Sequence, residues 1–299
     1  MQKYLLRRQL LNPGACIEIA HQEYESLLLA RRTLDDALAF EQKFELLLGN
    51  YKDFELAGAR WSLSRTVESR FDYQSGADIL MDANRLVVNF LATARLYVDQ
   101  VARVFSHLDL SEPFKTTVQE RLSNAYDASF EYRFMAALRN HVQHRTTPIH
   151  RLGGRQVRRE KTEEWADLYT AWVLKANLQD EGDFKATVLD EMPEEVDLRV
   201  AIRAYVTQIA EIHLGLRSYV DSRVRAARSL IEGTIQRYER ETNLSASRLH
   251  ACYSNGGGQE DEYTGWVLLL LAWDDVRKAL VLKNQGLRIL VSPRESIEQ

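Results

Sequence analysis

The chain has 299 residues and a net charge of −4, with 45% hydrophobic and 27% charged residues. This composition excludes a mainly disordered protein, and the length allows either one large domain or two modest ones. The longest apolar run, WVLLLLAW at 266–273, is far shorter than the roughly 20 residues that cross a bilayer. The N-terminus lacks the apolar core of a secretory signal, so we expect a cytoplasmic protein with no membrane partner.

Two cysteines, Cys16 and Cys252, stand far apart and have no neighbours at metal-ligand spacing. Neither a zinc site nor a disulfide framework is indicated, and we expect both residues to be buried thiols. The sequence predicts no metal and no cofactor. The net negative charge also argues against a protein that coats nucleic acid through bulk electrostatics.

Helical periodicity dominates the first half of the chain. Thr33 is predicted to cap a helix that carries apolar residues every three or four positions and ends at Gly49-Asn50. A second helix is predicted over 79–108. A third begins at Ser111, because Pro113 is tolerated in a first helical turn.

This third helix is predicted to continue through Leu138, with YDAS at 126–129 as a candidate interruption. Pro148 must end it. Because the residue before a proline disfavours helical geometry, the last regular turn should lie near His144 or Arg145.

Residues 153–195 predict a mixed connecting segment. Residues 167–177 have the composition of a strand, and the turn at 180–183 precedes a second candidate strand at 184–189. Together they predict a small β-hairpin, although 184–190 is equally consistent with a short helix.

Asp197 is predicted to cap the longest helix, which runs to about Tyr238 and spans on the order of 60 Å. GGG at 256–258 predicts a flexible connection. A helix is predicted over 263–283, and the segment LRILV predicts a short strand after it. We therefore predict a mainly α helical bundle with a long helix in its C-terminal half and a small β-hairpin insertion. Residues 1–152 form an N-terminal helical region, 153–195 a connection, and 196–299 further helices on the same bundle.

Several standard catalytic signatures are absent: the GxxxxGK[ST] phosphate loop, GxGxxG after a strand, HExxH and GxSxG. His213 falls near the apolar seam of the long helix and is interpreted as a core histidine with a hydrogen-bond partner. The remaining candidate is the stretch RNHVQHRTTPIH at 139–150.

In this stretch four residues separate Arg139 from His144, and the polar Asn140 follows the arginine directly. The pattern resembles the R-x(4-6)-H motif of the HEPN superfamily, a group of helical-bundle proteins many of which are metal-independent ribonucleases. The resemblance extends over about 79–150. The helix after Asp197 is a candidate further helix of the same bundle. It implies that Arg139, Asn140 and His144 are catalytic, and that RNA is cleaved to 2′,3′-cyclic phosphate and 5′-hydroxyl ends.

The residue types suit this chemistry. Histidine can take the 2′-hydroxyl proton or donate a proton to the leaving 5′-oxygen, because its ordinary pKa of about 6.5 lies near neutral pH. Arginine stays protonated and stabilises the extra negative charge of the transition state. Asn140 and His144 are helix neighbours at i and i+4, so the amide could orient the imidazole or bind a phosphate oxygen.

Arg139 and His144 would lie about 140° apart on an ideal helix and would not share one face. Either a local kink or a second copy of the motif at a twofold interface solves this problem. The resemblance implies the second solution, a homodimer with a composite active site. It also suggests a toxin–antitoxin or phage-defence role, with an antitoxin or regulatory partner.

Six arginines and three histidines occur between 139 and 159 without one acidic residue. RNA-backbone contacts are expected from His141, Arg145, Arg151, Arg155, Arg158 and Arg159. The alternative is a basic loop that pairs with the acidic segment 179–197 of the same or another subunit, which could hold a nuclease inactive. His141 is equally consistent with a solvated residue.

The alternative function is a non-catalytic helical scaffold, or a nucleotide- or RNA-binding protein that forms homo-oligomers. The long seam-like helix and the acidic net charge favour it. In that case Arg139 and His144 are structural or contact a phosphate without cleaving RNA.

Overall fold

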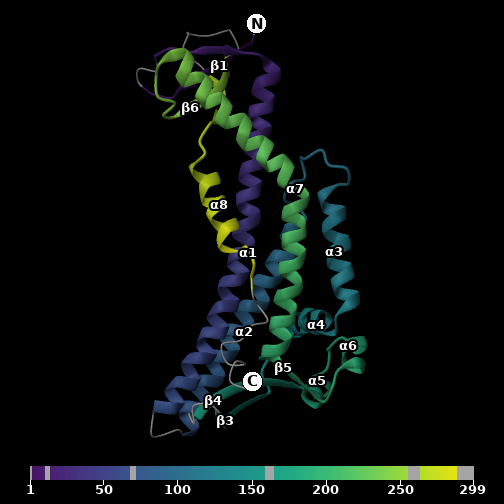
Figure 1. Cartoon of the computed structure of the whole chain (residues 1–299). Coiled ribbons are helices and arrows are strands. Elements are labelled where there is room, and N and C mark those ends of the chain that lie inside the picture. Colours follow the sequence, from purple (N-terminus) through teal and green to yellow (C-terminus); the bar gives the residue numbers. More distant parts are fainter. Residues whose placement is uncertain (1, 11–13, 68–71, 159–164, 255–262, 288–299) are drawn as a thin grey trace. The chain divides into compact units, whose positions relative to one another are not determined.

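The computed structural model describes residues 2–10, 14–67, 72–158, 165–254 and 263–287 (Figure 1). Its helices are α1 (His21–Val67), α2 (Tyr73–Val101), α3 (Phe114–Ala128), α4 (Phe130–His144), α5 (Lys175–Glu181), α6 (Ala186–Glu191), α7 (Leu198–Thr242) and α8 (Ala272–Lys283). Its strands are β1 (Lys3–Arg8), β2 (Ile17–Ile19), β3 (Arg151–Arg158), β4 (Trp165–Leu174), β5 (Glu195–Asp197), β6 (Leu249–Ser254) and β7 (Thr264–Leu268). The predicted mainly α fold with small β elements is confirmed.

The chain divides into two compact units, each assembled from separate segments. Unit 1 contains Met1–Gln42, Arg103–Phe114 and Gly215–Gln285, and unit 2 contains the remaining residues. Helices α1 and α7 contribute residues to both units. The units cut across the three segments proposed from the sequence, whose boundaries at 152 and 195 remain a prediction.

Unit 1 contains an antiparallel sheet of strand order β2-β1-β6-β7. Leu6 of β1 is fully buried opposite Ala251 of β6. The helix predicted over 263–283 is wrong in its first part, because 264–268 form strand β7 and helix α8 starts at Ala272. Gly265 has φ +58°, a backbone conformation that a right-handed helix does not accommodate.

The two cysteines differ in exposure. Cys252 is buried in β6, where burial raises the pKa of its thiol to about 12. Cys16 is exposed, so the expectation that both thiols are buried is wrong for Cys16. Cys16 precedes strand β2 rather than lying within the sheet. In the described part of the chain, no helix has the length and apolar character needed to cross a membrane.

Unit 2 contains a helical bundle that holds α4 in place. Phe90 of α2 packs edge-on against Tyr205 of α7, with ring centroids 6.2 Å apart. Arg203 of α7 donates to both carboxylate oxygens of Glu55 in α1, at 2.6 and 2.9 Å. Helices α2 and α4 also contact each other.

Two sequence-based helix assignments are confirmed. Helix α2 covers most of the predicted 79–108 span, although it starts earlier, after Asp72 accepts from the Ser75 amide. Asp197 caps α7 by accepting from the amides of Arg199 and Val200. Within α7, His213 is fully buried, contacts the Tyr97 hydroxyl at 3.0 Å and is the expected core histidine.

Helix α1 corrects the prediction of a helix limited to 33–49. Thr33 is an interior residue whose hydroxyl donates to the Leu29 carbonyl at 2.8 Å. Gly49 also lies inside the helix. The buried stripe continues past Gly49 through Tyr51, Phe54 and Trp61, and this packing overrides the weak stop signal.

The interruption predicted at 126–129 is confirmed. Ser129 separates α3 from α4, and its side chain accepts from the Tyr132 amide as an N-cap. Helix α4 ends at His144, as Pro148 required. Ser111 is not the cap predicted for α3, which begins at Phe114; its hydroxyl lies 3.3 Å from that of Tyr219 instead.

The β-hairpin exists, but with a different partner strand. β4 pairs antiparallel with β3 and, at its other edge, with the short β5. Residues 186–191 form helix α6, the alternative that the sequence left open. Leu178, Phe184 and Val188 are buried at spacings of six and four, and Phe184 packs against Phe134 of α4 with centroids 6.2 Å apart.

Candidate functional site

Helix α4 carries the Arg139–His144 motif at its C-terminal end. Its buried face includes Phe134, Met135 and Leu138, which fix the rotation of the helix in unit 2. After the helix, the Ile149 amide donates to Asn84 of α2 at 3.0 Å. The motif therefore lies on a helix that is held at its start by the Ser129 cap and anchored beyond its end by Asn84.

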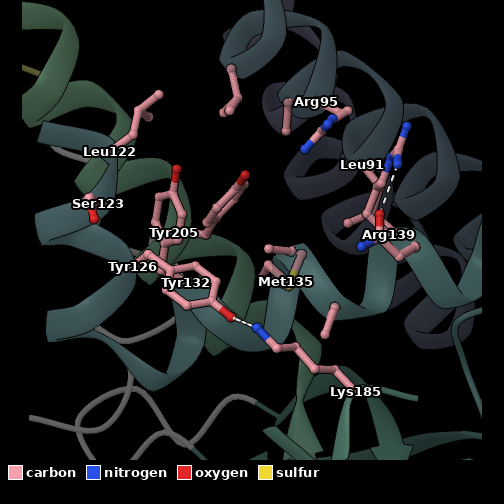
Figure 2. A pocket seen from close by; sticks show the side chains of 15 residues that line it. Leu91, Arg95, Leu122, Ser123, Tyr126, Tyr132, Met135, Arg139, Lys185 and Tyr205 are labelled. Carbon is pink, nitrogen blue, oxygen red and sulfur yellow. Dashed lines mark hydrogen bonds between the residues drawn. The ribbon is translucent and has the colours of Figure 1, made fainter. Parts of the chain in front are cut away.

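Arg139 and Asn140 line a pocket of about 380 Å³. The Arg139 Nη1 donates to the Asn140 side-chain oxygen at 2.8 Å, and Figure 2 draws this bond. The Arg139 Nε is buried without a hydrogen-bond partner. The Nε donor is thus left without a hydrogen bond inside the protein.

The pocket contains two more cationic side chains, Arg95 of α2 and Lys185 from the α5–α6 connection. Arg95 donates to Asp99 at 2.6 Å, and Lys185 donates to the Tyr126 hydroxyl. The pocket lining contains no Asp or Glu. In a chain with a net charge of −4 this lining is locally cationic, which suits a negatively charged ligand.

Three tyrosines also line the pocket: Tyr126 of α3, Tyr132 of α4 and Tyr205 of α7. Burial raises the pKa of Tyr132 to about 12 and that of Tyr205 well above its ordinary value. Both hydroxyls stay neutral at physiological pH, and they hydrogen-bond to each other.

His144 is exposed and is not part of this pocket lining. Within the described residues it has no hydrogen bond or ion pair. Five positions along an ideal helix place it about 140° from Arg139. Asn140, exposed and one turn earlier on the same side of α4, lies between the pocket and His144 along the helix.

His141 lies on the buried side of α4, with 3% of its surface exposed. Its Nε2 lies 2.8 Å from a carboxylate oxygen of Glu181, and His150 approaches the same oxygen at 3.7 Å. Burial lowers the pKa of His150, although Glu181 opposes this shift. Because its imidazole is buried against Glu181, His141 is neither accessible to RNA, as was expected of it, nor the solvated residue that the sequence also allowed.

The basic stretch pairs with the acidic segment of the same chain. Arg145 forms an ion pair with Asp183, and Arg151 forms one with Glu195. Arg151 also lies over the Trp172 ring, 4.4 Å from its centroid. The basic stretch therefore pairs with the acidic segment 179–197 within one subunit, which is the arrangement that the sequence offered as the alternative to RNA binding.

The other arginines expected to bind RNA follow in the chain. Arg155 and Arg158 belong to strand β3, opposite Leu168 and Trp165 of β4. Arg159 lies outside the described residues. In the described part of the chain, no group of three or more His, Cys, Asp or Glu side chains could hold a metal ion.

The sequence did not identify Arg95, Lys185 or the three tyrosines as site residues. They come from α2, α3, α4, α7 and the α5–α6 connection, and they meet only in the folded chain. Tyr205 carries a weak signal, since it places a hydroxyl group in a mostly apolar helix seam.

Comparison of the chain with protein-family models, with curated proteins and with solved structures finds no match. The HEPN resemblance accordingly rests on Arg139, Asn140 and His144 and on the end of the helix that carries them.

Proposed function

We propose that this protein is a metal-independent endoribonuclease of the HEPN type. The supporting observation is that Arg139 and Asn140 line a cationic pocket without a carboxylate, while His144 stands exposed one turn further along α4. A phosphate held at the Asn140 side of the pocket would contact the guanidinium, and the exposed His144 would act on the phosphate held by a second copy.

In this proposal Arg139 binds the scissile phosphate and stabilises the charge that develops during attack by the 2′-hydroxyl. His144 of a second copy takes the 2′-hydroxyl proton as the general base and then donates a proton to the leaving 5′-oxygen, in a composite homodimeric site. The products would carry 2′,3′-cyclic phosphate and 5′-hydroxyl ends.

RNA would approach along the exposed end of α4, where Arg145 and Arg151 offer cationic side chains that are each 47% exposed. Their ion pairs with Asp183 and Glu195 would have to exchange for phosphates, which would make binding sensitive to salt. We include in this proposal a cellular role as a toxin or in phage defence, with an antitoxin or regulatory partner. Only the family resemblance supports this role.

The test is cleavage of labelled RNA in EDTA by the parent chain and by the Arg139→Ala and His144→Ala variants. We expect the parent to cleave, and each variant to lose at least about a hundredfold in rate. The product ends are tested by ligation. A 3′ end that carries a cyclic phosphate cannot be ligated to an adaptor until a 3′-phosphatase has removed the phosphate.

Matched controls are His21→Ala and Arg225→Ala, which remove exposed residues of the same types in unit 1. Both should cleave like the parent. Equal cleavage by parent, His144→Ala and Arg139→Ala would reject the proposal, as would the absence of cleavage by the parent on all single-stranded RNAs tried.

A further inference from the structure

A buried cluster of three titratable side chains joins α4 to α5 within unit 2. Glu181 ends α5, and one of its carboxylate oxygens lies 2.8 Å from Nε2 of His141 and 3.7 Å from Nε2 of His150. The two imidazole side chains are 1% and 5% exposed. Histidine is the side chain whose charge ordinarily changes between pH 5 and 8. The packing around the cluster therefore depends on whether the two rings are charged.

The hydrogen bonds of His150 are those of a neutral imidazole. Its Nδ1 accepts from the Leu174 amide at 2.9 Å, so the single ring proton stands on Nε2, the nitrogen nearer to Glu181. Its own amide donates to the Trp172 carbonyl at 3.0 Å. A second ring proton would go to Nδ1 and displace the Leu174 amide. Protonation of His150 therefore breaks a bond at the end of β4, directly before α5 begins.

His141 also lacks a place for a second ring proton. Its Nε2 faces Glu181, which leaves Nδ1 as the site for that proton. In the described part of the chain, this Nδ1 is buried without a hydrogen-bond partner, and the Phe184 ring packs edge-on with its centroid 5.6 Å away. A buried N–H without an acceptor has lost its bond to water with no replacement. This loss opposes the attraction between a charged His141 and Glu181.

Other charged groups around the cluster are already paired. The ion pairs of the surrounding elements are Arg145–Asp183, Arg133–Glu191 and Arg151–Glu195. Lys175 of α5 donates to a backbone carbonyl at 3.0 Å. The charges that act on His150 are those of Glu181 and His141. Because carboxylates ordinarily titrate near pH 4 and lysine and arginine above pH 10, the histidines are the groups that respond between pH 5.5 and 7.5.

We propose that His141, His150 and Glu181 form an acid-sensitive joint, which holds α5 against α4 and the end of β4 at neutral pH and releases it when the histidines gain protons. Burial lowers the pKa of His150 in the closed joint, although Glu181 opposes this shift. In the released form His150 regains its ordinary pKa of about 6.5. Stabilisation of the closed joint is therefore present above about pH 6.5 and is lost as pH falls below it.

Release of the joint would loosen two neighbouring contacts. Asp183, two residues beyond Glu181, pairs with Arg145, and Phe184 packs against Phe134 of α4. Both contacts depend on α5 staying in place, so acid would also free the Arg145 side chain at the end of α4. The inference concerns the packing of α4, α5 and β4 and stands whether or not the protein cleaves RNA.

The experiment is hydrogen–deuterium exchange of the full chain at two pH values, with rates corrected for the intrinsic effect of pH. We expect peptides covering 172–184 to exchange at least about threefold faster at pH 5.5 than at pH 7.5, relative to peptides covering 205–216 of α7. Each histidine that stays neutral in the closed joint contributes up to about tenfold over this range. A smaller increase than about threefold would overturn the joint.

Two substitutions remove the charge change but keep the hydrogen bonds. In His141→Gln the side-chain amide can donate to Glu181, and in His150→Asn the side-chain oxygen can accept from the Leu174 amide. The double variant should exchange slowly at both pH values. His21→Gln, which replaces an exposed histidine of unit 1, should respond to pH like the parent. An increase in the double variant equal to the parent's would overturn the joint.

A single substitution and a spectroscopic readout protect the test from misfolding of the double variant. His141→Gln alone keeps the bond between Leu174 and His150, and its exchange should rise less with acid than the parent's. In the parent labelled with ¹⁵N-histidine, the ring signal that His150→Asn removes should show the proton on Nε2 at pH 7.5 and protons on both nitrogens where exchange rises. A proton on Nδ1 at pH 7.5, or a ring that stays neutral while exchange rises, would contradict the inference.

Discussion

Asn84 illustrates how a single buried polar side chain positions the candidate site. Its oxygen accepts from the Ile149 amide and its nitrogen donates to the Leu80 carbonyl, both at 3.0 Å. Ile149 is 4% exposed, so its amide has little access to water. The asparagine thereby ties the chain that follows Pro148 to helix α2.

Replacing Asn84 by alanine leaves the Ile149 amide buried without an acceptor. We expect the free energy of unfolding to fall by about 1–3 kcal/mol, the cost of an unsatisfied buried polar group. Urea denaturation measures it. Asn50→Ala, which removes a half-buried asparagine whose amide donates to the Leu46 carbonyl of its own helix, should change stability by less than about 0.5 kcal/mol. Equal effects of the two substitutions would contradict this role of Asn84.

Asp274 connects α8 to α7 in unit 1 and links stability to pH. Its side chain is 1% exposed and accepts from Arg277 and Arg228 at 2.5 Å. Burial alone would raise its pKa, but the hydrogen bonds and charges of Arg277 and Arg228 outweigh burial and lower the pKa below 3.8. A lowered folded-state pKa means that the stabilisation is present above pH 3.8 and is lost as pH falls through the folded value.

We expect Asp274→Asn to lower the free energy of unfolding at pH 7 by roughly 3 kcal/mol, since two arginines lose a buried carboxylate. The difference from the parent should shrink as pH falls below about 3.8 and through the lower folded-state pKa, because the carboxylate is protonated first in the unfolded parent and then in the folded one. Denaturant titrations at a series of pH values test both points. Asp275→Asn, at a side chain that is 59% exposed, should cost at most about 1 kcal/mol.

Among the elements, α1 shows that packing can extend a helix through residues that usually end one. Gly49 lies in its interior, and a Cβ built there would meet nothing within 4 Å. Gly182 lacks such neighbours too, but it ends α5 with φ +71°. The same residue type thus weakens one helix and is required at the end of another.

Gly49→Ala should stabilise the protein by about 0.5–1 kcal/mol, because alanine loses less backbone entropy in a helix than glycine. Gly182→Ala should destabilise it by about 1–2 kcal/mol, since an L-residue is strained at positive φ. Thermal unfolding of the two variants should move in opposite directions. A loss of stability in Gly49→Ala would show that the helix is interrupted there in solution.

For the whole molecule, the main proposal concerns two copies of the chain. Arg139 reaches the pocket and His144 does not, so one α4 helix does not bring both groups to the pocket. A twofold partner would supply the missing imidazole. The acidic segment that pairs with Arg145 and Arg151 in one subunit would then border the RNA path in the dimer.

Mixing tests this composite site. We expect the separately inactive Arg139→Ala and His144→Ala variants to regain part of the RNA cleavage when they are coexpressed, because a mixed dimer contains an intact arginine and an intact histidine from different copies. Light scattering should report a dimer for each variant. A monomeric parent that cleaves RNA, or mixed dimers without activity, would reject the composite site.

The sequence by itself determined the mainly α fold, the cap at Asp197, the end of α4 before Pro148, the break at Ser129 and the core role of His213. These features depend on local periodicity, on capping and on the fixed geometry of proline, all of which act over a few neighbouring residues. Only the tertiary structure decided that α1 continues through Gly49, that β4 pairs with β3, and that His141 is buried against Glu181. It also decided that Arg95, Lys185 and three tyrosines line one pocket with Arg139. Such pairings join residues far apart in the chain, and their free energy comes from burial and from ion pairs that exist only once the helices have packed.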